Sequence, residues 1–132
     1  EDLEQADLEA IAQAGLRLGI STHSYPELIR AKQLQPSYIA LGHIFATQTK
    51  QMPSKPQGLK RLGRYAAICR DIPTVAIGGI DMQKLEAVIN CGVDGVAVVS
   101  AITKEPDPEY AFSQLTNQFT RFSLESRYEY SA

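Results

Sequence analysis

The repeating pattern of this chain is clearest in residues 74–81, which read TVAIGGID. A short apolar run is followed by a glycine pair and then by Asp81, a residue type that caps helices. Three further apolar runs lie at residues 16–20, 38–41 and 95–99. Their near-continuous hydrophobicity is typical of parallel strands that are covered on both faces, so we predict a parallel sheet of four strands.

Amphipathic segments separate these strands, as the crossover connections of a parallel sheet require. A helix is predicted after each strand, and one further helix is predicted in front of the first strand. The predicted fold class is therefore α/β, built from parallel (β/α) units. Such units make either half of a (β/α)8 barrel or a small doubly wound sheet, since a complete barrel takes about 250 residues and this chain has 132.

Capping residues mark where the predicted helices begin. Asp7 precedes the first helix, and the Ser24 hydroxyl and Glu27 carboxylate form a capping box at the second. Asp81 and Asp107 open the last two helices. The apolar positions that should pack inward are Leu8, Ile11 and Ala12; Leu28, Ile29 and Ala31; Leu59, Leu62, Ala66 and Cys69; Leu85, Val88 and Ile89; and Phe112, Leu115, Phe119 and Phe122.

Composition and charge argue against nucleic acid and membrane as binding partners of this chain. With 44% hydrophobic and 21% charged residues the chain is ordinary globular material, and its net charge of -2 leaves no basic excess for nucleic acid. No apolar run approaches the ~18 residues of a membrane span.

Cys69 and Cys91 form no CxxC pair, so we predict that both are reduced residues of the packed interior and that the protein is cytoplasmic. Because the chain opens on Glu1, we also expect a fragment of a longer protein.

Polar or glycine-rich residues follow the predicted strands, at the end where parallel α/β proteins bind ligands. Ser21 follows the first strand, Gly78 and Gly79 follow the third, and Ser100 follows the fourth. Because these strand ends meet at one edge of the sheet, their hydroxyls and backbone amides are placed to hold a phosphate group. The alternative for the glycine pair is a plain tight turn.

A long connection follows the second strand, from Gly42 to Gly58. It exceeds the usual ~4 to 6 residues, and connections of this length are often functional. Thr47, Thr49 and Lys50 supply two hydroxyls and one cation, a set suited to a diphosphate. The alternative is a solvated polar loop.

The two histidines and the N-terminal acids are weaker candidates. His23 and His43 follow successive strands, but no third His or Cys ligand accompanies them, which favours a capping or supporting role over a metal site. Glu1 and Asp2 offer the oxygen ligands that magnesium prefers, although exposed acids near an N-terminus are usually only solvated.

Five blocks occur in order along the chain: EDL (1–3), LGISTH (18–23), YIALGHIFATQTK (38–50), VAIGGI (75–80) and GVAVVSAI (95–102). Together they resemble the thiamine phosphate synthase family over about residues 1–120. The resemblance implies a TIM (β/α)8 barrel of which this chain is the second half. It also implies a transferase of thiamine biosynthesis that joins a hydroxymethylpyrimidine diphosphate to a thiazole phosphate, releases diphosphate and uses Mg2+.

The resemblance also implies roles for single residues. Asp2 matches a magnesium ligand and Ser21 a residue at the pyrimidine diphosphate, while Lys50 matches the lysine on the departing diphosphate, so that Lys50 and Ser21 would take part in catalysis. The residues that match contacts to the thiazole phosphate are Thr47, Thr49, Gly79, Val99 and Ser100.

Two departures from the family pattern accompany these matches. Ala46 stands where the family has proline, and the residues of the family's first four strands, including a second magnesium ligand and the remaining pyrimidine contacts, have no counterpart in this chain. We expect a half-barrel over residues 1–122, followed by a polar tail over 123–132 that has no clear period. The partner of this half-barrel would be a missing N-terminal half or a second copy of the chain.

Two other functions remain open from the sequence. One is a thiazole tautomerase-like relative, in which His23 would be the base and magnesium would not be needed. The other is a non-catalytic half-barrel that binds phosphate or serves as an assembly module. The diphosphate-type set at Thr47, Thr49 and Lys50 favours the synthase over both.

Overall fold

The structure, a computed structural model, describes residues 19–46 and 56–131. Its four strands form one parallel sheet in the order β1-β2-β3-β4. The strands are β1 (Gly19–Thr22), β2 (Tyr38–Leu41), β3 (Thr74–Ile77) and β4 (Gly95–Ala97). The predicted helix at Asp7 and the first three residues of the predicted first strand lie outside the described residues.

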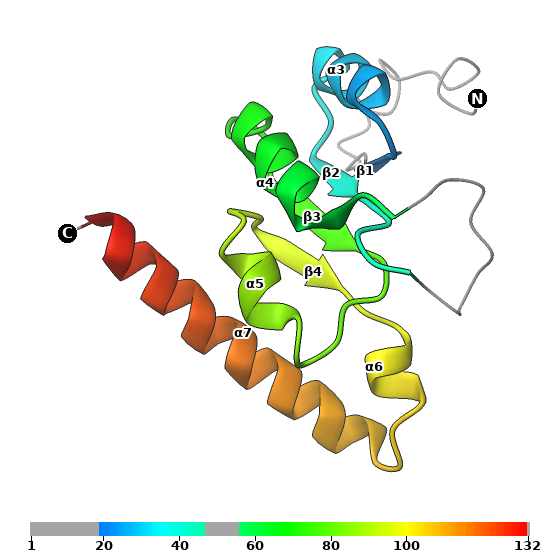
Figure 1. Cartoon of the computed structure of the whole chain (residues 1–132), viewed down its shortest axis with the longest axis vertical. Coiled ribbons are helices and arrows are strands. Elements are labelled where there is room, and N and C mark those ends of the chain that lie inside the picture. Colours follow the sequence, from blue (N-terminus) through cyan, green and yellow to red (C-terminus); the bar gives the residue numbers. More distant parts are fainter. Residues whose placement is uncertain (1–18, 47–55, 132) are drawn as a thin grey trace.

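Helices follow the strands as predicted. The helices are α3 (Tyr25–Gln33), α4 (Gly58–Ile68), α5 (Leu85–Ile89), α6 (Ser100–Thr103) and α7 (Pro108–Ser131). α3, α4 and α5 succeed one another along the sheet, α7 packs against α5, and α6 lies beyond the end of β4 (Figure 1). The predicted α/β class with parallel (β/α) units is confirmed. The short helix α6, directly after β4, was not predicted.

The sheet has one covered and one uncovered face among the described residues. Ile20, Ile39 and Ala76 point toward the helices and are at most 5% exposed, whereas Tyr38 and Ile77 on the opposite face are 43% and 40% exposed. The covering on both faces that near-continuous hydrophobicity favours is found on one face only among the described residues, as in an open half of a barrel. The described helices pack against a single face of the sheet, so burial alternates along the strands.

The core lies between that covered face and the helices. Leu28, Ala31, Leu62, Leu85 and Val88 are buried there, as predicted. The prediction fails at two positions. Ile29 is 47% exposed because it follows Leu28 by one residue and is turned about 100° away around the helix axis. Phe112 is 59% exposed because it lines an open groove beside β4 and α6, where no described element covers it.

The predicted caps form where the signal is local. The Ser24 hydroxyl accepts a hydrogen bond from Glu27 N at 3.4 Å, and the Glu27 carboxylate accepts one from His23 N at 2.8 Å. Asp107 accepts a hydrogen bond from Tyr110 N at 3.1 Å at the start of α7. Asp81 accepts one from Lys84 N at 3.1 Å, but a turn intervenes there and α5 begins only at Leu85.

The polar tail expected over residues 123–132 is helical as far as Ser131. α7 continues from Pro108 through residue 123 to Ser131 without a break. An ion pair joins Arg121 Nε to Glu125 Oε1 at 3.2 Å across one turn of this helix, a spacing that supports helix formation. Within the described ranges, no helix combines the length and the apolarity needed to cross a bilayer.

Candidate functional site

The carboxyl ends of the four strands surround one hollow of about 470 Å³, here called the strand-end hollow. Four of the predicted site residues line it together, and they come from the ends of three different strands: Ser21, Gly79, Val99 and Ser100. The remaining lining residues are Thr22, His23, Ala40, Gly42, His43, Ile77, Gly78, Ile80, Ala97 and Val98.

The turn after β3 is built from backbone that only glycine adopts easily. Gly78 has a φ of 109° and Gly79 a φ of 65°, both in the left-handed region. A Cβ on Gly78 would lie 2.4 Å from the Cβ of His43, and a Cβ on Gly79 would lie 2.5 Å from the carbonyl oxygen of Ala46. The glycine pair is therefore a close-packed wall of the hollow, beyond what a surface turn requires.

The segment after β2 is fixed against this turn at its start. Ile44 N donates to Ile77 O and Phe45 N donates to Gly78 O, both at 3.0 Å, which extends the contact between β2 and β3 past the strands. The segment that leads into α4 returns to the same place, since Gln57 N donates to His43 O at 2.8 Å and Gly58 N to Ile44 O at 2.9 Å. Both described ends of the long connection thus lie side by side at the hollow.

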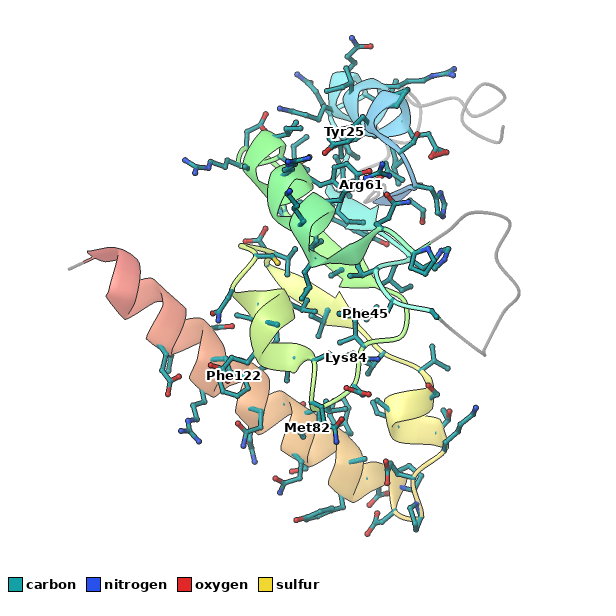
Figure 2. All side chains as sticks on the ribbon, in the orientation of Figure 1. Tyr25, Phe45, Arg61, Met82, Lys84 and Phe122 are labelled. Atoms are coloured by element: carbon teal, nitrogen blue, oxygen red, sulfur yellow. The ribbon has the colours of Figure 1, made fainter. Side chains whose placement is uncertain are left out.

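The Gln57 side chain joins this connection to β1 and α4. Its Nε2 donates to His23 O at 2.7 Å, while its Oε1 accepts from the Tyr65 hydroxyl at 2.9 Å and from Arg61 Nη1 at 3.2 Å. Figure 2 shows Arg61 and Tyr25 close together between α3 and α4, where the guanidinium lies 5.9 Å from the Tyr25 ring centre. Burial raises the pKa of Tyr65, which keeps its hydroxyl a neutral donor.

The sequence did not point to Gln57 because two of its three partners, Tyr65 and His23, lie 8 and 34 residues away along the chain. The only local signal is its position between Pro56 and Gly58, immediately before the apolar stripe of α4. A glutamine at a helix start is common enough that this signal does not identify an anchor by itself.

Lys84 is a second residue that the sequence did not single out. Its Nζ donates to Gly79 O at 3.2 Å and lies 4.7 Å from the centre of the Phe45 ring, and Figure 2 shows the two side chains together. Asp81 Oδ2 is 3.9 Å from the same Nζ. Lys84 therefore fixes the carbonyl of Gly79 and joins the glycine turn to the start of the long connection.

The two histidines differ in their surroundings. His23 is a partly exposed side chain whose Nδ1 lies 3.6 Å from Glu27 Oε2, and its backbone belongs to the capping box of α3. His43 is only 5% exposed and packs against Gly78. Among the described residues no group of three or more His, Cys, Asp or Glu side chains is arranged to hold a metal ion.

The other predicted site residues, Asp2, Thr47, Thr49 and Lys50, lie outside the described residues. The described lining of the hollow offers hydroxyls, imidazoles and backbone groups, and it includes no carboxylate. Hydroxyl, imidazole and backbone N–H donors suit the oxygen atoms of a phosphate. Since magnesium prefers carboxylate and other hard oxygen ligands, the described lining does not form a magnesium site by itself.

Fold and hollow together define the class of protein: parallel (β/α) units of the TIM-barrel type, with a ligand hollow at the carboxyl ends of the strands. A comparison with family models supports a narrower assignment. The model described as thiamine monophosphate synthase matches residues 1–102. The chain belongs to the thiamine monophosphate synthase family.

Individual relatives agree with this assignment. The chain is 62% identical over 115 residues to a thiamine-phosphate synthase of Serratia proteamaculans, and 64% identical over 115 residues to one of Yersinia pestis. Each alignment covers 87% of this chain and 54% of the relative. The chain thus spans about half the length of the curated relatives it matches.

Solved structures show the same fold. A thiamine phosphate pyrophosphorylase from Pyrococcus furiosus superposes with a TM-score of 0.72 at 30% identity, over 90% of this chain and 55% of that protein. A 3-hexulose-6-phosphate synthase from Salmonella typhimurium superposes with a TM-score of 0.65 at 22% identity, which shows the fold alone. The TIM-barrel type of the (β/α) units is confirmed by these likenesses.

Proposed function

We propose that this chain supplies the thiazole phosphate side of a thiamine phosphate synthase site. The complete enzyme would join a hydroxymethylpyrimidine diphosphate to a thiazole phosphate and release diphosphate. One observation carries the proposal: Ser21, Gly79, Val99 and Ser100, expected at the substrates from the sequence, line a single hollow. The names of the relatives and the family support the same reaction.

The chemistry asks for charge stabilisation at a leaving group. As the bond between the pyrimidine methylene carbon and the diphosphate oxygen breaks, electrons pass to the diphosphate and the thiazole nitrogen forms the new bond to carbon. Lys50 would stabilise the diphosphate, Ser21 would contact the pyrimidine diphosphate, and Thr47 and Thr49 would hold the thiazole phosphate. A hollow of neutral donors without carboxylates suits a bound phosphate.

Magnesium and the location of the protein belong to this proposal too. Asp2, outside the described residues, is the proposed magnesium ligand, and its partners would come from the part of the barrel that the relatives have in addition. We place the protein in the cytoplasm, since Cys69 and Cys91 are free thiols, as expected in a reducing compartment. The partner of the half-barrel would be an N-terminal half or a second copy.

Ligand binding by the chain itself tests this proposal. In a titration with thiazole phosphate, we expect saturable shifts of the backbone amide signals of Gly79 and Ser100 in ¹H–¹⁵N spectra. The backbone amide signal of Gly63, on α4, serves as the internal control and should not shift. If the amide signals of Gly79 and Ser100 do not shift with thiazole phosphate, the hollow is not the binding site of that compound.

A Lys50→Ala substitution tests the catalytic part. The assay uses an enzyme completed by the first half of the Serratia relative, with both substrates and Mg2+. We expect its turnover to fall by a factor of about 100 or more, because the departing diphosphate no longer has the positive charge of Lys50 beside it. The circular dichroism spectrum should stay unchanged. Near-normal synthase activity of Lys50→Ala would rule out the role given to this lysine.

A tautomerase-like activity is the second candidate. His23 lines the hollow and its Nδ1 lies 3.6 Å from Glu27 Oε2, an arrangement that a base oriented by a carboxylate also uses. Conversion of a thiazole phosphate tautomer without pyrimidine or magnesium, abolished by His23→Ala, would favour this function. Diphosphate release that depends on both substrates would favour the synthase.

A further inference from the structure

One buried polar atom in the described part of the chain has no hydrogen-bond partner, and it belongs to a residue of the strand-end hollow. This atom is Nδ1 of His43. The residue as a whole is only 5% exposed, so bulk water does not replace the missing partner. Buried nitrogens of this kind are almost always paired in folded proteins, and an unpaired one calls for an explanation.

The position of His43 is fixed by its backbone. Its carbonyl accepts a hydrogen bond from Gln57 N at 2.8 Å, and the next residue, Ile44, donates to Ile77 O at 3.0 Å. Its Cβ packs against Gly78 so closely that a side chain on Gly78 would collide with it. The imidazole is therefore held beside the glycine turn, and only rotation about its own side-chain bonds is free.

The surroundings of the imidazole indicate which group completes it. His43 lines the same hollow as Ser21, Gly79 and Ser100, whose hydroxyls and amides suit phosphate oxygens. A neutral imidazole that carries its proton on Nδ1 is one more donor of this type. Among the described residues no hydroxyl, carbonyl or carboxylate pairs with His43 Nδ1, so a ligand in the hollow is the group that can supply its acceptor.

We propose that His43 is a ligand-binding residue, whose Nδ1–H donates a hydrogen bond to a phosphoryl oxygen of the compound held in the strand-end hollow. This inference rests on the proposed function, because it assigns one contact within the same site. It assigns a binding role to a residue for which the sequence favoured only a capping or supporting role. It also explains why a polar side chain is buried at this position without a partner from the protein.

The imidazole can be observed directly, because the chain has two histidines and His23 is a built-in control. We would record long-range ¹H–¹⁵N spectra of the full chain with labelled histidine during titration with thiazole phosphate and, separately, with inorganic phosphate. Both probes should shift the Nδ1 signal of His43 saturably, with the smaller effect at His23. A shift with thiazole phosphate but none with saturating inorganic phosphate would overturn the assignment of a phosphoryl partner.

Three substitutions test the same contact. Asparagine places a polar atom near the position of Nδ1, glutamine places one near Nε2, and leucine removes both. We expect His43→Asn to keep the affinity for thiazole phosphate within about threefold, and His43→Gln and His43→Leu to weaken it about tenfold, as the loss of a hydrogen bond to a charged group does. If His43→Leu does not fold, the comparison of His43→Asn with His43→Gln and the wild-type spectra still decide whether His43 Nδ1 contacts the ligand.

The result also separates this inference from the proposed function. If the amides of Gly79 and Ser100 respond to thiazole phosphate while the His43 imidazole does not, or if Asn and Gln variants bind equally well, His43 is not a ligand contact and the proposed function stands. If neither the amides nor the imidazole respond, both proposals fail.

Discussion

At the scale of single residues, the glycine turn after β3 shows how backbone geometry shapes the hollow. Gly79 has a φ of 65° and leaves no room for a Cβ beside the carbonyl of Ala46. Gly63, in the middle of α4, has open space around the position of a Cβ. Glycine is therefore required at position 79, where a side chain has no room, but not at position 63, where a side chain fits.

We expect Gly79→Ala to destabilise the protein by about 1–3 kcal/mol, since it forces a side chain into a left-handed turn with a backbone collision. Its affinity for thiazole phosphate should fall as well. Gly63→Ala should instead stabilise the helix by about 0.5–1 kcal/mol and leave binding unchanged. Urea unfolding and ligand titration measure both effects, and equal behaviour of the two variants would refute the argument.

The residue scale also shows which positions can be placed from the sequence. Ser21, Gly79 and Ser100 were expected at one edge of the sheet, because parallel strands bring their carboxyl ends together, and the family resemblance added Val99. The structure brings these four residues to one hollow. Gln57 and Lys84 were missed, because Gln57 contacts His23 and Lys84 lies over the Phe45 ring, and no local pattern encodes contacts between residues so far apart in the sequence.

At the scale of elements, local signals placed helix starts well and inward faces less well. The capping residues Ser24 and Asp107 act within three residues, so the sequence contains the whole interaction. Ile29 and Phe112 were misplaced because exposure depends on which neighbouring element covers a face. The extension of α7 past residue 123 was missed because its polar end shows no apolar period, although short-range pairs support it.

The anchor between the long connection and α4 leads to a prediction for stability. Gln57→Leu leaves the buried Tyr65 hydroxyl without its acceptor, which should cost about 1–3 kcal/mol. Tyr65→Phe removes the donor, so the double variant should be more stable than the sum of the two losses predicts, with a coupling of about 1 kcal/mol. Urea unfolding of the four proteins measures this cycle, and strictly additive losses would contradict the contact.

The two thiols after α4 and α5 make the stability of the chain depend on alkaline pH. Burial raises the pKa of the thiols of Cys69 and Cys91, so the folded chain keeps protons that the unfolded chain releases. This contribution is complete below the unfolded thiol pKa of about 8.5 and is lost as the pH rises through the folded values. The free energy of unfolding should therefore fall above about pH 8.5.

Substitution of the more buried thiol checks this pH dependence. Cys69→Ala should lower stability at every pH, because it leaves a small cavity, but it should flatten the decline above about pH 8.5. The measurement is the slope of unfolding free energy against pH for the two proteins. An unchanged slope would show that the thiol of Cys69 does not titrate with unfolding.

At the scale of the whole molecule, the described sheet is open. Within residues 19–46 and 56–131, β1 and β4 each pair with one neighbour, and no helix of these ranges lies over the face that carries Tyr38 and Ile77. A separate groove beside β4, lined by Val96 and Phe119 among others, lies on the helix side of the sheet, where Val96 is paired with Ala76. Relatives of about twice the length have additional chain, and the closed barrel expected for the family would cover both edges and the open face.

Unpaired strand edges and apolar faces promote association, so the chain by itself should form dimers or larger species in sedimentation velocity experiments. Tyr38→Arg and Ile29→Arg make a matched pair, since the original side chains are 43% and 47% exposed but lie on the open sheet face and on the outer side of α3. Charge on the open face should shift the protein toward the monomer, because a desolvated arginine opposes contact there, whereas the same charge on α3 should not. A wild-type chain that remains monomeric at high concentration, or two variants that sediment alike, would show that the open face does not drive association.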